Sequence, residues 1–518
     1  MRLSDRETLR TWWTGLVERC GDRCFLRFQA CDASTRSFTY AEFYAYVRRM
    51  ANFLIEDGVR PGENIAVQLY NSPESIAALF AIAEAGAVSV PLNIQHKLDE
   101  CVRVIERCNI GRIITDPDFQ EYYDGREGSY AMPRLYVSHA SDGTLSPGSI
   151  DFDAAVARQS DVLSEVRPQA SGDVVEIMFT SGTTSAPKGV EVTHANFVLS
   201  GQYGCWQHAM RPDDVFLTTM PAFHSNFQLA ALTPVLAAGA TLVFVAKYSA
   251  RRFWSQVVSH GATLTQMVSM MVKTTLMQPV DAHERDHRLR SIQYYLPLSE
   301  EEKGRFEDRF RARLQNCYGL TESICWAATE PPFERGPWPS VGRVGIGYAV
   351  EVRRADGSCA SSGEEGEICI QGVPGTTLMK GYYQDAAATA QALDGDGWLH
   401  TGDVGVFDER GWLFFVDRDS NMIKRAGENI SAAEVEHAIM EMPQVKEAAV
   451  IGVADPVRDE AVKAFVALEA GAHVSADEIR SFCAQRLADY KVPGFVAFVD
   501  ALPKTSVGKV AKKLLREE

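Results

Sequence analysis

The sequence predicts an α/β protein with a large N-terminal domain of two helix-covered sheets plus a small β-barrel, and a smaller mobile C-terminal α+β domain. Three observations predict this fold class. Helical and strand patterns alternate over the first half of the chain, short strands between glycine-containing turns follow, and the last segment carries an apolar face of its own. The alternation favours parallel sheets, because parallel strands need crossover connections that are usually helices.

The first half of the chain supplies the two sheets. A helix is predicted over 41–57 and a second one over 75–86, on the basis of apolar residues at helical spacing. Buried strands are predicted over 64–69, 87–91, 113–115, 174–179, 215–219 and 241–246.

The later part of the chain changes pattern. Short strands such as 366–372 and 411–416 alternate with turns between about residues 341 and 415, which is typical of a small antiparallel barrel. A helix over 432–442 and a strand over 447–452 then indicate a separate module of about 100 residues, an ordinary domain size. We therefore place the two domains at 1–419 and 420–518.

Composition and charge exclude several classes of protein. The chain has 518 residues, 46% hydrophobic and 23% charged, which argues against a disordered chain or a disulfide scaffold. Lys and Arg number 52 against 68 Asp and Glu, so the formal net charge is −16. No nucleic-acid partner is expected, because phosphate neutralisation needs clustered cations.

Cysteine usage and hydropathy indicate the compartment. The eleven cysteines include no CxxC pair, and the charged N-terminus has no apolar core. We therefore expect reduced thiols and a cytoplasmic location. The most apolar stretch, 229–246, contains Pro234 and Gly239, whereas a membrane span needs about 20 unbroken apolar residues, so no membrane span is expected.

The strongest local motif follows the strand predicted over 174–179. Glycine allows a tight turn that presents backbone N–H groups, hydroxyls add donors and a lysine adds positive charge, so this loop is suited to a polyphosphate. Pro187 stands where a Walker loop requires the glycine before its lysine, and an ordinary surface loop is the alternative. The candidate residues are Thr180, Ser181, Gly182, Thr183, Thr184 and Lys188.

This loop and five further motifs, in the same order, resemble the AMP-forming acyl-CoA synthetases of the adenylate-forming superfamily. The other motifs are Tyr318-Gly-Leu-Thr-Glu322, Trp398-Leu-His-Thr-Gly-Asp403, Asp417-Arg418, Lys424-Arg-Ala-Gly-Glu-Asn-Ile430 and Pro503-Lys-Thr-Ser-Val-Gly-Lys509. Within the superfamily, three segments resemble the crotonobetaine/carnitine–CoA ligase branch: Met220-Pro-Ala-Phe-His224, Lys247-Tyr-Ser-Ala-Arg251 and Trp338-Pro-Ser-Val-Gly-Arg-Val-Gly345.

The resemblance implies an ATP-dependent acid–CoA ligase with ATP/AMP, Mg²⁺ and coenzyme A as cofactors. A small carboxylic acid and ATP would give acyl-AMP and pyrophosphate, and the CoA thiol would then displace AMP. Three alternatives remain: an enzyme specialised for thioester formation from a supplied acyl-AMP, acyl transfer to a carrier protein, and a nucleotide-sensing or scaffold protein. A homodimer is an open alternative to a monomer.

The resemblance also implies roles for single residues. Lys509, in a basic tail, would catalyse adenylation, although a solvated basic terminus is the alternative. The 180–189 loop would cradle the β- and γ-phosphates. The other implied roles are Tyr318 against the adenine, Thr321 on the α-phosphate, Glu322 on Mg²⁺, Asp403 on the ribose hydroxyls and Arg418 on the nucleotide.

The resemblance also implies functional residues in the C-terminal domain and in the acyl pocket. Rotation at the hinge residue Ser420 would bring the loop at Gly427 to the acyl-AMP. Lys424, Arg425 and Lys491 are candidates for the CoA phosphates, or are solvated surface charges. His224 would line the acyl pocket or guide the carboxylate, and Phe227 and Trp326 would offer aromatic faces to a quaternary ammonium group or pack in the core.

Three departures from the family pattern concern these steps. Ser185 replaces the usual glycine of the phosphate loop, Ser420 removes the charge usual at the hinge, and 294–299 lacks the small residues that many relatives have beside the adenine. The first and third departures bear on the handling of ATP.

Overall fold

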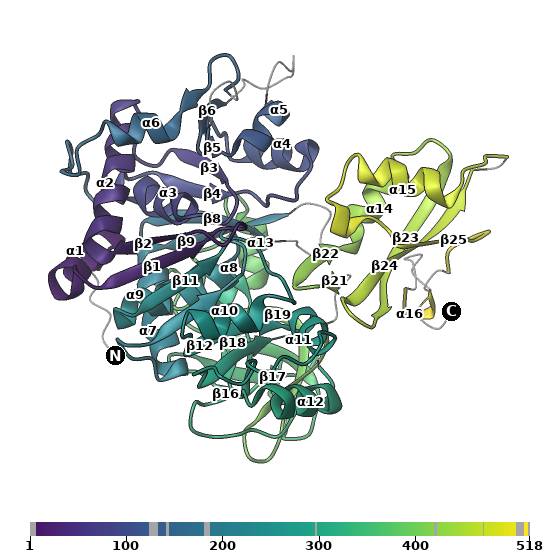
Figure 1. The fold of residues 1–518 in the computed structure, drawn as a ribbon. Coiled ribbons are helices and arrows are strands. Elements are labelled where there is room, and N and C mark those ends of the chain that lie inside the picture. The colour runs from purple at the N-terminus through teal and green to yellow at the C-terminus, as the bar shows by residue number, and fades with distance from the viewer. Residues whose placement is uncertain are drawn as a thin grey trace.

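The N-terminal body of the protein contains two large sheets and a half-barrel, and a separate C-terminal unit lies beside it (Figure 1). The computed structural model describes residues 7–123, 133–140, 145–180, 187–295, 298–418, 422–469, 471–503 and 512–515. We call residues 7–418 the N-terminal body and residues 422–515 the C-terminal unit.

The first sheet has seven strands in the order β7-β6-β5-β3-β4-β8-β9. All neighbours are parallel except the β8–β9 hairpin. The strands are β3 (Asn64–Gln68), β4 (Val88–Pro91), β5 (Arg112–Thr115), β6 (Arg134–Val137), β7 (Ile150–Asp151), β8 (Val174–Thr180) and β9 (Lys188–Thr193). The helices of this part are α2 (Tyr40–Glu56), α3 (Pro73–Glu84), α4 (Leu98–Arg107), η1 (Pro117–Phe119), α5 (Gln120–Tyr123) and α6 (Phe152–Ala157).

The second sheet has nine strands in the order β16-β15-β14-β13-β12-β10-β11-β1-β2, parallel from β14 to β1 and antiparallel at both edges. Its strands are β1 (Cys24–Gln29), β2 (Thr35–Thr39), β10 (Val215–Thr218), β11 (Thr241–Val245), β12 (Leu264–Val268), β13 (Ser291–Tyr295), β14 (Leu314–Tyr318), β15 (Ala328–Thr329) and β16 (Arg343–Val344). The helices are α1 (Leu9–Cys20), α7 (His194–His208), α8 (Ser225–Phe227), η2 (Gln228–Leu232), α9 (Thr233–Ala238), α10 (Phe253–Ser259), α11 (Ser269–Leu276), α12 (Glu300–Phe310) and η3 (Thr321–Ser323).

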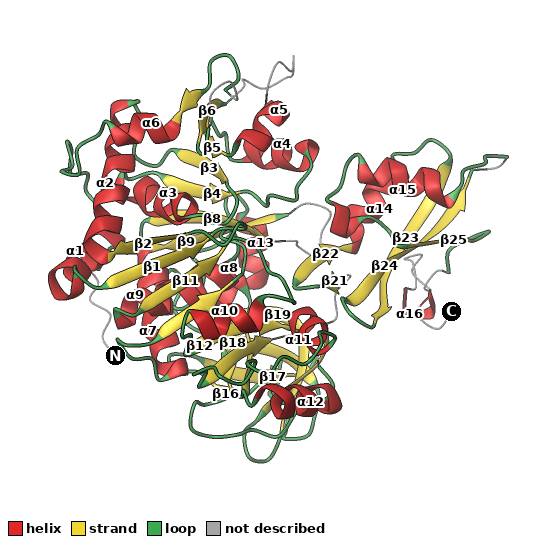
Figure 2. Ribbon diagram, viewed as in Figure 1, coloured by secondary structure: helices red, strands yellow, loops and turns green. Residues whose placement is uncertain are grey.

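Helix α3 shows how the body is packed. It is buried along its whole length and contacts α1 and α2 as well as β3, β4 and β8. A helix that is apolar on nearly all sides is stable only when it is covered on all sides. The apolar side chains of α3 therefore join both sheets into one hydrophobic core. Figure 2 shows the helices arranged around the strands of these sheets.

The half-barrel is a four-stranded antiparallel sheet in the order β17-β18-β19-β20. Its strands are β17 (Ala349–Arg353), β18 (Gly366–Gln371), β19 (Trp398–Phe407) and β20 (Leu413–Arg418), with α13 (Ala386–Ala392) before β19. The small β-barrel expected from the sequence is thus confirmed in the form of a half-barrel.

The C-terminal unit has its own core, separate from that of the body. Strands β22 (Glu428–Ser431), β21 (Met422–Arg425), β24 (Asp459–Leu468) and β23 (Val445–Asp455) pair in this order, and β25 (Phe495–Phe498) pairs with β24. Its helices are α14 (Ala432–Met440), α15 (Ala476–Ala484), η4 (Asp489–Lys491) and α16 (Lys512–Leu515). Figure 1 shows the β21–β22 hairpin on the side of the unit that faces the body.

The predicted fold class is confirmed. The ends of helices α2 and α14 differ from their predicted positions by one or two residues. Helix α2 begins one residue before its predicted start because Thr39 and Glu42 form a capping box. The Thr39 hydroxyl accepts the Glu42 N–H at 3.1 Å, and the Glu42 carboxylate accepts the Thr39 N–H at 2.8 Å. Helix α14 ends at Met440, two residues before its predicted end.

The predicted boundary between residues 419 and 420 falls outside the described residues and stays a prediction, as does the mobility of the C-terminal domain. Among the described residues, none of the helices combines the length and the apolar character that a bilayer crossing requires. The cytoplasmic location and the homodimer also stay predictions.

A buried histidine predicts acid sensitivity of the fold. His194 is 2% exposed, its Nδ1 accepts the Leu9 N–H at 3.1 Å, and burial lowers the pKa of this ring to about 4. Because the folded protein binds this proton less readily than the unfolded chain, stability is present above about pH 6.5 and is lost as pH falls. We expect the free energy of unfolding to drop by about 2 kcal/mol between pH 7 and pH 5 through this group alone.

The variant His194→Asn keeps an acceptor near the Leu9 N–H but does not titrate, so urea unfolding should show a weaker loss of stability between pH 7 and pH 5. His473→Asn, at an exposed histidine of the C-terminal unit, is the control and should follow the wild type. Equal pH dependence of wild type and His194→Asn would contradict the prediction.

Candidate active site

One cavity of about 1200 Å³ opens between the two sheets, the half-barrel and the C-terminal unit. Parallel strands place their carboxyl ends at one edge, and β8, β13 and β14 end beside this cavity. Its volume is somewhat larger than the 300–1,000 Å³ or so of a typical ligand pocket. The cavity therefore has room for more than one small ligand. The predicted site residues that line it are Thr180, Lys188, His224, Tyr318, Thr321, Glu322, Asp403, Lys424 and Gly427.

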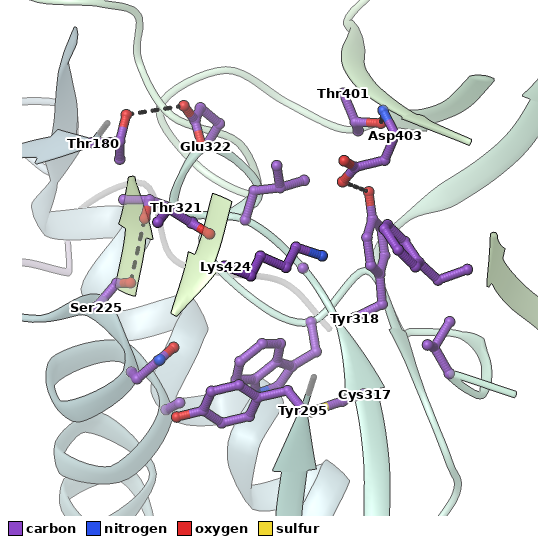
Figure 3. Close-up of a pocket in the computed structure, with 18 of the residues that line it drawn as sticks. Thr180, Ser225, Tyr295, Cys317, Tyr318, Thr321, Glu322, Thr401, Asp403 and Lys424 are labelled. Atoms are coloured by element: carbon purple, nitrogen blue, oxygen red, sulfur yellow. Dashed lines mark hydrogen bonds between the residues drawn. The ribbon is translucent and has the colours of Figure 1, made fainter. Parts of the chain in front are cut away.

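One wall of the cavity combines a carboxylate, hydroxyls and a cation. The Glu322 carboxylate accepts the Tyr382 hydroxyl at 2.9 Å and the Thr180 hydroxyl at 3.5 Å. Lys188 pairs with Thr180 in the β8–β9 register, and its Nζ lies 4.8 Å from the centre of the Tyr382 ring. Oxygen donors beside a cation suit a metal–polyphosphate group. Figure 3 shows the Thr180–Glu322 contact at the cavity.

The opposite wall presents an aromatic ring and a carboxylate that are fixed to each other. Tyr318, at the end of β14, donates its hydroxyl to Asp403 Oδ2 at 2.7 Å (Figure 3). Asp403 is 3% exposed, and its N–H donates to Thr401 Oγ1 at 3.1 Å, which holds the strand at this point. The Phe415 ring lies 6.1 Å from that of Tyr318. Arg418 is the register partner of Asp403 in β20, but its side chain lies outside the described part.

His224 caps the short helix α8 and lines the cavity. Its Nδ1 accepts the Asn226 N–H at 3.2 Å, which leaves the proton of the neutral ring on Nε2. Burial lowers the pKa of His224, although the Glu428 carboxylate from the hairpin acts in the opposite direction. Ser225 Oγ links this turn to Thr321, because the two hydroxyl oxygens lie 3.3 Å apart.

The end of the cavity nearest to α7 is aromatic and uncharged. The Tyr295 and Trp326 rings stack with their centres 5.0 Å apart. The Tyr203 hydroxyl donates to the Trp326 carbonyl oxygen, and the Gln207 side chain donates to Thr329 at 2.9 Å. Polar groups here thus bond within the protein and leave ring faces for a ligand. Described residues at this end are Ser200, Tyr203, Gly204, Gln207, Leu229, Ala230, Tyr295 and Trp326.

The expectation for Phe227 is corrected in favour of its alternative. Its ring is 1% exposed and packs against Phe244 at 4.4 Å between ring centres, so it belongs to the hydrophobic core. Trp326 lines the cavity as expected. Within segment 294–299, Tyr295 fills part of the wall with its ring instead of leaving it open.

The β21–β22 hairpin closes one side of the cavity. Lys424 Nζ lies 4.2 Å from the centre of the Phe415 ring, and Figure 3 shows Lys424 between Thr321 and the Tyr318–Asp403 pair. Gly427 has φ +94°, a conformation that favours glycine, and approaches Val268 of the body. Asp459 joins the hairpin region to α11, because it accepts the Ser269 hydroxyl and lies 3.7 Å from Lys273 Nζ.

A buried lysine holds the C-terminal unit against the body. Lys491 Nζ lies 2.6 Å from Glu100 of α4 and 3.0 Å from both carboxylate oxygens of Glu434. The three side chains are 5%, 3% and 6% exposed. Burial acts to lower the pKa of Lys491, but Glu434 and Glu100 outweigh it and raise the pKa. Lys491 is therefore not an open site for CoA phosphates in this arrangement, which corrects that expectation.

Several predicted residues lie outside the described part of the chain: Ser181, Gly182, Thr183, Thr184, Ser185, Ser420 and Lys509. Sequence reasoning missed two residues that the cavity brings in, Tyr382 and Asp459. Tyr382 follows Gly381 in an aromatic pair, which was a weak indication of a turn near a ligand. Asp459 became recognisable only when the two parts of the chain were placed together.

Comparison with known protein families gives matches over most of the chain. A family described as AMP-binding enzyme matches residues 16–383, and the AMP-binding enzyme C-terminal domain matches residues 434–509. The crotonobetaine/carnitine–CoA ligase of Salmonella paratyphi A is 40% identical over 511 residues, 98% of this chain and 99% of that protein. The ligase of the same name from Proteus mirabilis is 40% identical over 518 residues, 100% of both chains.

Solved structures agree with these matches. A double mutant of o-succinylbenzoate CoA synthetase from Bacillus subtilis, bound with its product analogue, has a TM-score of 0.86 at 27% identity and 98% coverage of both chains. The amide bond synthetase McbA from Marinactinospora thermotolerans has the same TM-score and identity, covering 98% of this chain and 99% of that one. The chain therefore belongs to the AMP-binding enzymes, as an AMP-forming acid–CoA ligase of the adenylate-forming superfamily.

Proposed function

We propose that this ligase activates a small acid of the betaine type and carries out both half-reactions, from the acid and ATP through acyl-AMP to the CoA thioester. One observation carries the proposal: a single cavity joins the Thr180–Glu322 wall, the Tyr318–Asp403 wall and an uncharged aromatic end. A carboxylate, a nucleotide and a thiol can meet there.

The nucleoside is assigned to the Tyr318–Asp403 wall. Tyr318 would lie along the adenine, and Asp403 would accept the ribose hydroxyls. The hydrogen bond between the two side chains fixes the carboxylate before the nucleotide arrives, so little rotamer freedom is lost on binding. Arg418 would also contact the nucleotide, and its support is its position as the register partner of Asp403.

The phosphates are assigned to the opposite wall. Lys188 would pair with the β- and γ-phosphates, with the 181–184 segment as further donors, and Thr321 would contact the α-phosphate. Glu322 is the proposed Mg²⁺ ligand, and its setting among hydroxyl oxygens fits a hard cation. Bound Mg²⁺ would neutralise phosphate charge as the acid attacks. Lys509 remains the proposed cation that stabilises charge in adenylation.

The acid is assigned to the aromatic end. The stacked Tyr295 and Trp326 rings offer π faces, which attract quaternary ammonium groups. A second carboxylate is disfavoured, because no described residue at this end carries a positive charge to pair with it. The 40% identity to ligases named for crotonobetaine and carnitine supports the same class of acid. His224, with a neutral ring, would orient the reacting carboxylate through its Nε2–H.

The second half-reaction is assigned to the arrangement described here. The hairpin at Gly427 reaches the cavity, so a thiol arm could enter beside it, and Lys424 would stabilise charge on the leaving AMP. Acyl transfer to a carrier protein is the alternative to CoA, and the enzyme restricted to the thioester-forming half remains the alternative to the complete ligase.

The acid and the acceptor can be tested together. We expect ATP–pyrophosphate exchange with a trimethylammonium acid, at least tenfold weaker exchange with its uncharged tert-butyl isostere, and none with a dicarboxylate. We also expect thioester formation with CoA in preference to a carrier protein. Thioester formation from supplied acyl-AMP without any exchange would contradict the complete ligase, and Lys509→Ala with unchanged acyl-AMP formation would contradict the role of that lysine.

The nucleoside assignment predicts a specific loss. Asp403→Asn should raise the KM for ATP about 10- to 100-fold, because a hydrogen bond to a charged group contributes about 1.5–3 kcal/mol. The matched control is Asp118→Asn, which changes an exposed carboxylate that also accepts a tyrosine hydroxyl, from Tyr70 at 3.2 Å. Steady-state kinetics would check both variants, and an unchanged KM in Asp403→Asn would refute the assignment.

The interface between the body and the C-terminal unit predicts that loss of Glu100 affects the two half-reactions differently. Glu100→Gln removes the partner of Lys491 in the body but leaves Glu434 in the C-terminal unit. We expect the CoA-dependent step from supplied acyl-AMP to slow about tenfold, a cost of about 1.4 kcal/mol, with ATP–pyrophosphate exchange nearly unchanged.

The control is Asp489→Asn, which breaks the exposed Lys97–Asp489 pair across the same interface, 2.8 Å apart with Asp489 84% exposed. Exposed pairs contribute little, so both half-reactions should keep their rates in this variant. Equal slowing of both half-reactions in Glu100→Gln would show that the triad does not select the arrangement described here.

A further inference from the structure

A group of metal-ligating side chains lies on the half-barrel, next to the nucleoside wall but outside the assignments made above. Glu367 and Cys369 stand two residues apart on β18, and His400 on β19 is the register partner of Cys369. Residues two apart on a strand share a face, so all three side chains meet on one side of the sheet. One ligand atom from each lies within 4.8 Å of the others.

The two distances from His400 to the other ligand atoms match those of a tetrahedral zinc site. His400 Nδ1 lies 3.6 Å from Cys369 Sγ and 3.3 Å from a Glu367 oxygen. With Zn–S near 2.3 Å and Zn–N and Zn–O near 2.0–2.1 Å, a tetrahedron has edges of about 3.6 Å between S and N and about 3.4 Å between N and O. The third pair, Cys369 Sγ and a Glu367 oxygen, lies within 4.8 Å, and a cation would hold these two atoms about 3.6 Å apart.

The hydrogen-bond partners of His400 and Glu367 are also typical of a metal site. His400 Nε2 faces Asp394 at 3.5 Å, and metal-bound histidines usually place their second ring nitrogen against a carboxylate. Asp394 is itself held by the N–H groups of Asp396 and Trp398. The second oxygen of Glu367 accepts the Gly402 N–H at 3.0 Å, so this carboxylate is oriented in advance.

We propose that Glu367, Cys369 and His400 form a binding site for one thiophilic divalent transition metal of the zinc class. Glu367 and His400 line the cavity, so the fourth coordination position faces it and would take water. Sulfur and imidazole ligands distinguish this site from the oxygen ligands proposed for Mg²⁺ at Glu322. Metal binding breaks the S–H bond and forms a metal–sulfur bond, and the proton leaves to solvent.

The site would be connected to the nucleoside wall through the backbone. Gly402 lies between His400 and Asp403 on β19, where the register with β18 shifts, and Glu367 accepts its N–H. A cation bound to Glu367 and His400 would restrict this part of β19. The site adds to the proposed ligase reaction and does not depend on the identity of the acid.

The experiment is a Co²⁺ titration of the full-length, nucleotide-free protein under non-thiol reducing conditions. We expect one equivalent of Co²⁺ to give a thiolate-to-metal charge-transfer band with tetrahedral d–d absorption, and Zn²⁺ to remove both. Cys369→Ser should abolish the charge-transfer band. Cys359→Ser, at an exposed cysteine, is the matched control and should keep it.

His400→Asn tests the site without changing the thiol and should weaken Co²⁺ binding at least tenfold. Thermal unfolding without metal shows that each variant is folded, and Zn²⁺ should raise the Tm of the wild type more than that of Cys369→Ser. Absence of the charge-transfer band in the wild type, or its persistence in folded Cys369→Ser, would overturn the proposal.

Discussion

The active site of this protein depends on one buried ion triad, in which Lys491 lies between Glu100 and Glu434. A charge taken out of water is costly unless partners surround it, so the triad forms only when the C-terminal unit sits against α4. That contact places the β21–β22 hairpin, with Lys424 and Gly427, at the cavity. The exposed Lys97–Asp489 pair crosses the same interface but is screened by water.

The cavity itself follows from the two parallel sheets. Parallel strands of a sheet end at a common edge, and the last residues of β8 and β14, Thr180 and Tyr318, both line the cavity although more than a hundred residues separate them. The Thr180–Glu322 hydrogen bond joins the end of β8 to the segment after β14, and the Tyr318–Asp403 hydrogen bond joins β14 to β19 of the half-barrel. The half-barrel contributes Asp403 to one of these pairs and Glu367, Cys369 and His400 to the proposed metal site, so one small sheet carries two kinds of ligand chemistry.

Much of the fold could be predicted from local patterns. Helix α2 was placed within one residue because apolar spacing is a local pattern, and the Thr39–Glu42 capping box accounts for its earlier start. Motifs likewise identified Tyr318, Glu322 and Asp403, because each belongs to a short run of unusual residues. Burial was less predictable: Phe227 became a core residue and Lys491 an interface residue through contacts with segments far away in the chain.

The sequence by itself determined the α/β class, and its motifs pointed to Tyr318, Glu322 and Asp403, which line the cavity, because periodicity and short motifs are local properties. Only the tertiary structure decided that Tyr382 would contact Glu322, that Asp459 would reach Ser269, and that Cys369 would lie opposite His400. These contacts depend on strand register and on the docking of the two parts, which arise from packing over the whole chain.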